Sequence, residues 1–194
     1  MSTLTKADKE NFWIRCYLSP TTDLTEAAID RAYRDFNRTL HGISKTQKEG
    51  NHSELKILLR NFVSEALNET FLTQKIFDKW HEMKCNELIT SFKNISGHKL
   101  FVGQAQKWIN MTLKYLFALG EDRINGISRN YQFFHIPIDN IIQDKLSKSE
   151  IPKFKDPWSR INNYSEYLNY QKLVRTKFYG QIPMDVEFRL FNEL

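Results

Sequence analysis

Proline and glycine are scarce in this chain, which has five prolines and seven glycines among its 194 residues. Both residues interrupt helices, so their scarcity leaves long stretches that can stay helical. Alternating, valine-rich segments of the kind that form strands are also few. The sequence therefore predicts a compact all-α fold of about eight to ten helices.

Long apolar runs are missing as well. No segment of about 18 apolar residues occurs, so we expect no membrane-spanning helix and no membrane partner. The first residues, 1–6, contain no apolar signal region, which favours a cytoplasmic protein. The two cysteines, Cys16 and Cys85, lie far apart in the chain and are expected to be two reduced thiols.

Hydrophobic residues make up 41% of the chain, which is enough to bury one core. We expect a single domain over residues 1–194, with two small helical lobes, 1–94 and 95–194, as the alternative. The formal net charge of +5 and the pI near 9.1 favour a polyanionic partner such as nucleic acid. Many proteins of similar charge bind no polyanion, so charge alone indicates little.

The beginning of the chain shows two helical segments. Residues 6–17 form the first, which Ser19-Pro20 closes. The segment Asp23-Leu24-Thr25-Glu26 has the pattern of a capping box and starts the second, which stops at Gly42. The apolar residues that share one face of this second helix are Ile29, Tyr33, Phe36 and Leu40.

A polar stretch then separates these helices from the next ones. Residues 44–52 are polar and contain Lys, Gln and Gly, and we expect them to form a mobile loop. Helical spacing of apolar residues continues over 53–67 and over 71–92, where the pattern fits one long helix or two short ones.

The second half of the chain contains the clearest helix. Residues 104–119 carry an apolar stripe made by Ile109, Leu113 and Leu116. A long connection over 121–134 follows, and 137–146 reads as a short helix with Pro137 in its first turn. The aromatic-rich tail ends in a helix over 184–192.

Two motifs within residues 95–146 resemble those of a known enzyme superfamily. Phe101-Val102-Gly103-Gln104-Ala105-Gln106-Lys107 resembles the second half of a helix-hairpin-helix, where base-excision DNA glycosylases have Leu-Pro-Gly-x-Gly-x-Lys and a catalytic lysine. His135-Ile136-Pro137-Ile138-Asp139 is similar to the Pro-x-Asp of the same superfamily. The nearest branches are the 8-oxoguanine glycosylases, including the compact archaeal type.

The resemblance implies a role for each piece. Lys107 would attack the sugar C1′ as a neutral amine, expel the base and leave a Schiff base, which also allows AP-lyase activity. Asp139 would offset the positive charge on the sugar and help to activate the nucleophile. Gly103 would bring backbone N–H groups to a DNA phosphate. The candidates for further contacts with the DNA backbone are Lys99, His98 and Arg129.

The implied partner is double-stranded DNA with an oxidised or otherwise modified base, which the enzyme flips out of the stack. No cofactor is needed for this chemistry. Repair and defence against modified foreign DNA would use the same residues, and the oligomeric state stays open. If Lys107 points away from the pocket, Asp139 can still direct water at C1′, which gives a glycosylase without lyase activity.

This chain departs from the family pattern at several points. Val102 stands where the family has proline, and Ala105 stands where it has the second glycine. The interval of 32 positions between Lys107 and Asp139 is long for the family. A simpler interpretation makes Lys107 a solvated lysine on the polar helix face that it shares with Asn110 and Lys114. Asp139 would then be only a helix cap.

Three other interpretations remain open. The spacings Arg34 to His41 and Arg129 to His135 fit the loose Arg-x(4–6)-His pattern of the all-α HEPN ribonucleases. A second possibility is that His81 and Cys85, one helical turn apart, supply two zinc ligands. In a third, the chain is a helical interaction protein that exposes some of its 26 aromatic residues to a partner.

Overall fold

The computed structural model describes residues 3–18 and 21–193, which form eight α-helices and no strand. The all-α prediction is therefore confirmed. The helices are α1 (Lys6–Tyr17), α2 (Leu24–Phe36), α3 (Lys45–Asn68), α4 (Gln74–Ser96), α5 (Val102–Leu119), α6 (Asn140–Ser147), α7 (Tyr164–Lys177) and α8 (Pro183–Asn192). Three short 3-10 turns lie between them, at η1 (Asn37–Thr39), η2 (Tyr131–Phe133) and η3 (Trp158–Arg160).

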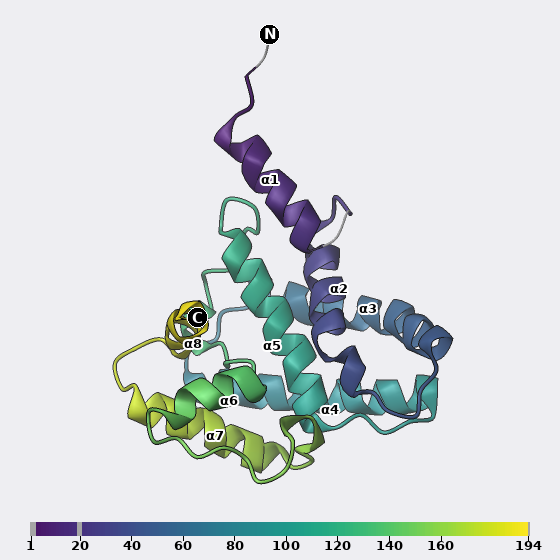
Figure 1. Cartoon of the computed structure of the whole chain (residues 1–194), viewed down its shortest axis with the longest axis vertical. Helices are drawn as coiled ribbons and strands as arrows, with labels where there is room; N and C mark the ends of the chain where they lie inside the picture. Colours follow the sequence, from purple (N-terminus) through teal and green to yellow (C-terminus); the bar gives the residue numbers. More distant parts are fainter. Residues whose placement is uncertain (1–2, 19–20, 194) are drawn as a thin grey trace.

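Helix α5 runs through the middle of the molecule, and the other helices except α1 surround it (Figure 1). Sixteen of its 18 residues are buried. Helices α2 and α4 pack along it, and η3 covers its first turn. A helix that is buried on every side has no solvated face, so its polar side chains must find partners inside the protein.

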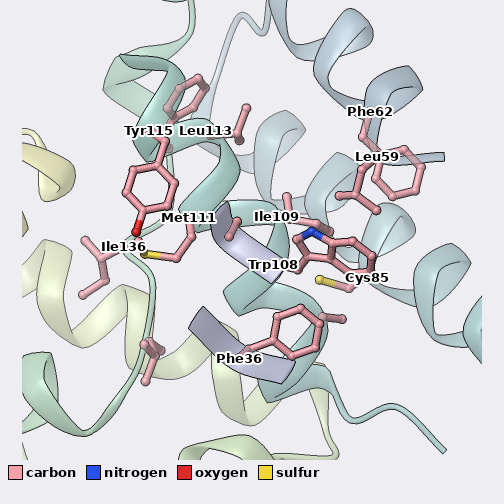
Figure 2. Close-up of a cluster of buried hydrophobic side chains, with 14 of the residues drawn as sticks. Phe36, Leu59, Phe62, Cys85, Trp108, Ile109, Met111, Leu113, Tyr115 and Ile136 are labelled. Carbon is pink, nitrogen blue, oxygen red and sulfur yellow. The ribbon is translucent and has the colours of Figure 1, made fainter. Parts of the chain in front are cut away.

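The core forms around Trp108 of α5, which is fully buried and donates its indole N–H to the Ile29 carbonyl at 3.1 Å. The Phe36 ring lies 5.3 Å from the Trp108 ring, centroid to centroid (Figure 2). All four apolar residues predicted for one face of the second helix are buried, although α2 ends at Phe36 rather than at Gly42 and Leu40 follows η1. Residues from both halves of the chain, such as Leu59 and Ile136, belong to this one core.

Residues 44–52 differ from the prediction of a mobile loop, because α3 begins at Lys45. Ser44 is its N-cap: the Ser44 hydroxyl accepts the Gln47 N–H at 3.2 Å, and the Gln47 side chain accepts the Ser44 N–H at 3.1 Å. This reciprocal pair is a capping box, which starts a helix even in a polar segment. The predicted helix over 53–67 is the remainder of α3.

Helix α1 has the bounds that the sequence predicts, and it extends away from the body (Figure 1). None of its residues is buried. The predicted stop at Ser19-Pro20 lies outside the described residues. Within residues 3–18 and 21–193, no helix is both long and apolar enough to cross a membrane.

Candidate functional site

Lys107 and Asp139 meet in the folded protein although 32 positions separate them. The Lys107 Nζ lies 2.7 Å from Asp139 Oδ2. The Lys107 side chain is only 6% exposed, and that of Asp139 is 24% exposed. Lys107 is therefore not a solvated surface lysine, and the two groups form a partly buried ion pair.

Asp139 is held in place by the start of helix α6. Its Oδ1 accepts the backbone N–H of Ile142 at 2.9 Å, so Asp139 is the N-cap and α6 begins at Asn140. The predicted start at Pro137 is wrong, since Pro137 lies in the extended segment before the helix. A carboxylate at this position is stabilised by the positive end of the helix dipole. One oxygen caps the helix and the other faces Lys107.

The extended segment before Asp139 is bound to α5 by the neighbour of Lys107. Gln106 donates to the Ile138 carbonyl at 3.0 Å and accepts the Ile138 N–H at 3.2 Å. This pair of bonds reproduces the pairing that a neighbouring strand would give. Gln106 thereby places Asp139, which follows Ile138, opposite Lys107, which follows Gln106.

The Lys107–Asp139 pair lines a cavity of about 660 Å³ between α1, α2, α5, α6 and α8. Five cationic side chains and three carboxylates line it, a net of two positive charges. The cationic residues are Arg31, Arg34, Arg38, Lys107 and Lys114, and the acidic ones are Asp35, Asp139 and Glu187. Aromatic side chains complete the wall, namely Trp13, Tyr17, Tyr115, Phe188 and Phe191.

A second ion pair lies two turns along α5 from the first. Lys114 Nζ donates to Glu187 Oε1 of α8 at 2.7 Å, and both side chains are less than a tenth exposed. The rings of Phe188 and Phe191 each lie 4.7 Å from the ammonium. Burial raises the pKa of the Glu187 carboxyl, and the charge of Lys114 opposes this shift.

A third charged group connects α1 to the body at the cavity. The Arg31 guanidinium lies 4.5 Å from the Tyr17 ring and 3.1 Å from Asp35. The Tyr115 hydroxyl donates to Asp35 at 2.5 Å, and burial together with the Asp35 charge raises the pKa of Tyr115. The neighbouring Arg34 donates to the Leu18 carbonyl at the end of α1.

Gly103, which was predicted to contact a DNA phosphate, is buried in the structure. Its backbone N–H donates to the Ile161 carbonyl at 3.0 Å. A Cβ on Gly103 would lie 1.8 Å from the Trp158 carbonyl oxygen. Glycine is needed here because η3 packs closely on the first turn of α5, so this backbone faces the protein interior.

The other three residues predicted to contact DNA do not line the cavity. Lys99 is exposed and its ammonium lies 4.6 Å from the Phe101 ring. Arg129 is exposed and donates to the Asn68 carbonyl at 2.7 Å, while His98 follows the C-terminus of α4. The structure therefore does not bring these side chains together with Lys107.

Three arginines line the cavity; Arg31 and Arg38 were not predicted as site residues, and Arg34 was singled out only for its spacing to His41. Arg31, Arg34 and Arg38 follow one another at helical spacing, with Asp35 on the same face. This spacing was visible in the sequence and indicated one charged helix face. Nothing local indicated the pairing of Lys114 with Glu187, which is 73 positions away.

His81 and Cys85 belong to a buried polar network that reaches α5 through Asn110. His81 contacts Tyr164 and Asn110, both at 2.8 Å, and burial lowers its pKa well below the usual value. Cys85 lies 3.7 Å from the same ring, and burial raises the pKa of its thiol. Among the residues that the structure describes, no three His, Cys, Asp or Glu side chains are grouped to hold a metal ion.

The two Arg-to-His spacings do not form a common site in the cavity. Arg34 lines the cavity, but His41 is exposed beyond η1 and does not. His135 is 1% exposed and contacts Asp78 at 2.7 Å in the buried network, whereas Arg129 lies on the surface.

Comparison of the chain with protein-family models, with curated proteins and with solved structures found no match. The residues that define the site are the Lys107–Asp139 pair, the arginines of α2 and the aromatic side chains of α1, α5 and α8.

Proposed function

We propose that this protein is a DNA glycosylase that excises an oxidised or otherwise modified base, with Lys107 as nucleophile and Asp139 as its partner. One observation carries the proposal. An amine and a carboxylate lie 2.7 Å apart on the wall of a cavity large enough for a nucleotide. The cavity volume falls in the range of about 300–1,000 Å³ that small-molecule sites occupy.

The two groups can perform base excision as follows. Asp139 is within reach to accept a proton from Lys107, which frees the amine lone pair. The amine attacks C1′, the N-glycosidic bond breaks, and the base leaves with the bonding electrons and takes up a proton. The Asp139 carboxylate offsets the positive charge that develops on the sugar. Opening of the sugar ring then gives the Schiff base on Lys107, which water or β-elimination resolves.

The rest of the lining suits the substrate. Arg34 and Arg38 are exposed at the cavity, and guanidinium groups bind phosphate with paired hydrogen bonds. In this proposal they take the phosphate-binding role that the sequence motif assigned to Gly103. Phosphate contacts of this kind position the strand without reading its sequence. The aromatic rings around the cavity can hold an extruded base.

The test uses duplexes that each contain one modified base and a borohydride trap. We expect the wild-type protein to be cross-linked to one such duplex. Lys107→Gln should abolish the cross-link, and Asp139→Asn should abolish base release. Lys172→Gln is the matched control, because it removes an exposed lysine outside the cavity and should leave both products unchanged. The proposal is wrong if both cavity variants release base as the wild type does.

A further inference from the structure

Helix α1 exposes three aromatic side chains to solvent, of which Tyr17 contacts Arg31 of the body and Phe12 and Trp13 are the most exposed. Phe12 is 59% exposed and Trp13 is 69% exposed, and their rings form an edge-to-face pair with centroids 5.4 Å apart. The other three tryptophans, Trp80, Trp108 and Trp158, are at most 6% exposed. Large exposed rings on a helix that buries nothing indicate a binding surface rather than part of the core.

Trp13 lies at the mouth of the cavity, and the Phe12 ring packs against the Trp13 ring. Trp13 lines the cavity and is also largely exposed, so it marks the boundary between the cavity and solvent. Several contacts attach α1 to the body: Arg123 binds Glu10 at 2.8 Å, and the Arg31 guanidinium lies over the Tyr17 ring. Arg34 also donates to the Leu18 carbonyl. Trp13 therefore has a defined position on the wall of a cavity that Lys107, Arg31 and Arg34 also line.

The arrangement of α1 does not suit a second helix or a membrane surface. Phe12, Trp13 and Ile14 are consecutive, so their side chains spread over about 200° of the helix instead of forming one apolar stripe. Ile14 and Tyr17 face the cavity, and the charged residues Asp8 and Glu10 occupy the preceding turns. Two exposed rings that point in different directions fit flat partners, because one partner can stack on each ring.

Exposed cationic side chains are present on α1 and along the cavity that Trp13 lines. Arg15 is exposed on α1, Arg34 is exposed on α2, and Arg38 is exposed in η1. Proteins that bind single-stranded nucleic acid combine aromatic rings, on which bases stack, with cations that follow the phosphates. The charge of this surface is complementary to such a strand.

We propose that Trp13 and Phe12 form a stacking surface for unpaired bases, such as those of a single strand or those that flank an extruded nucleotide. This inference deepens the proposed function, on which it rests for the extruded nucleotide. Binding of a plain single strand needs no modified base and no excision. The two proposals can therefore fail separately.

The experiment follows tryptophan emission while the full chain is titrated with oligothymidylate of about ten nucleotides. Stacking on Trp13 should quench emission, and added salt should reverse the quenching because the phosphate contacts weaken. Binding is measured in parallel by the anisotropy of a labelled oligonucleotide. Trp13→Ala should weaken binding about tenfold, while Trp13→Phe, which keeps a ring, should retain most of it.

Tyr179→Ala is the matched control, since Tyr179 is 92% exposed but does not line the cavity. It should bind like the wild type. Trp13→Ala should fold normally because α1 has no buried residue. Unchanged emission at saturating oligonucleotide overturns the inference, and so does equal binding by Trp13→Ala. It is also overturned if Trp13→Ala breaks a dimer, or if neutral phospholipid vesicles shift the emission and the oligonucleotide does not. Quenching without base excision would overturn only the glycosylase proposal.

Discussion

Replacing Asp139 by asparagine leaves the charge of Lys107 without its carboxylate partner. Asparagine caps helices about as well as aspartate, so α6 should keep its N-cap. The Lys107 ammonium, 6% exposed, would lose the carboxylate 2.7 Å away. Removing one partner of a buried ion pair costs about 3–5 kcal/mol. Because Asp139 is 24% exposed and the cavity admits water, we expect about 2–3 kcal/mol here.

The assay is urea unfolding at neutral pH for a double-mutant cycle of four proteins. Asp139→Asn should lower the transition midpoint with an unchanged slope, which shows a loss of stability rather than a changed denatured state. Lys107→Met removes the charge and keeps the volume, so Lys107→Met combined with Asp139→Asn should recover most of the loss. A double variant as unstable as the sum of the single ones would refute the ion pair. An Asp139→Asn protein within about 0.5 kcal/mol of the wild type would refute it too.

Two further predictions concern stability. Gly103→Ala should destabilise the protein by about 1–3 kcal/mol or more, because its Cβ would overlap the Trp158 carbonyl. Thermal unfolding measures the loss, and an unchanged unfolding temperature would contradict the packing of η3 on this glycine. Stability should also fall as the pH drops below about 6.5, by up to about 1.4 kcal/mol per pH unit for each of His81 and His135. Burial lowers the pKa of both rings, so below that pH the unfolded chain binds protons that the folded protein does not. Urea midpoints that stay constant between neutral and mildly acidic pH would contradict this assignment.

The two ion pairs on α5 explain why a central helix can carry lysines. Lys107 and Lys114 lie on a face of α5 that looks inward, and each has a carboxylate partner from a C-terminal element. Without Asp139 and Glu187 these ammonium groups would be buried and unpaired, which is costly. The same face lines the cavity. The charges of Lys107 and Lys114, which the fold pairs with carboxylates, would therefore also face a molecule bound in the cavity.

Local signals in the sequence predicted most of the helices. Scarce proline and glycine predicted the all-α class, and the bounds 6–17 agree with α1. The prediction of a loop over 44–52 was wrong, because it relied on the polar composition of the segment and not on its capping pattern. Ser44 and Gln47 have the spacing of a capping box, and that pattern would have started a helix there.

Helical period determines which residues share a face, and the sequence alone carried that information for α2 and for Lys107 with Lys114. The period does not determine what lies opposite a face, since that depends on helices distant in the chain. Only the tertiary structure buried Lys107, turned Gly103 toward Trp158 and brought Glu187 to Lys114. The cavity exists because α1, α2, α6 and α8 converge on α5, and no segment of the sequence contains that arrangement.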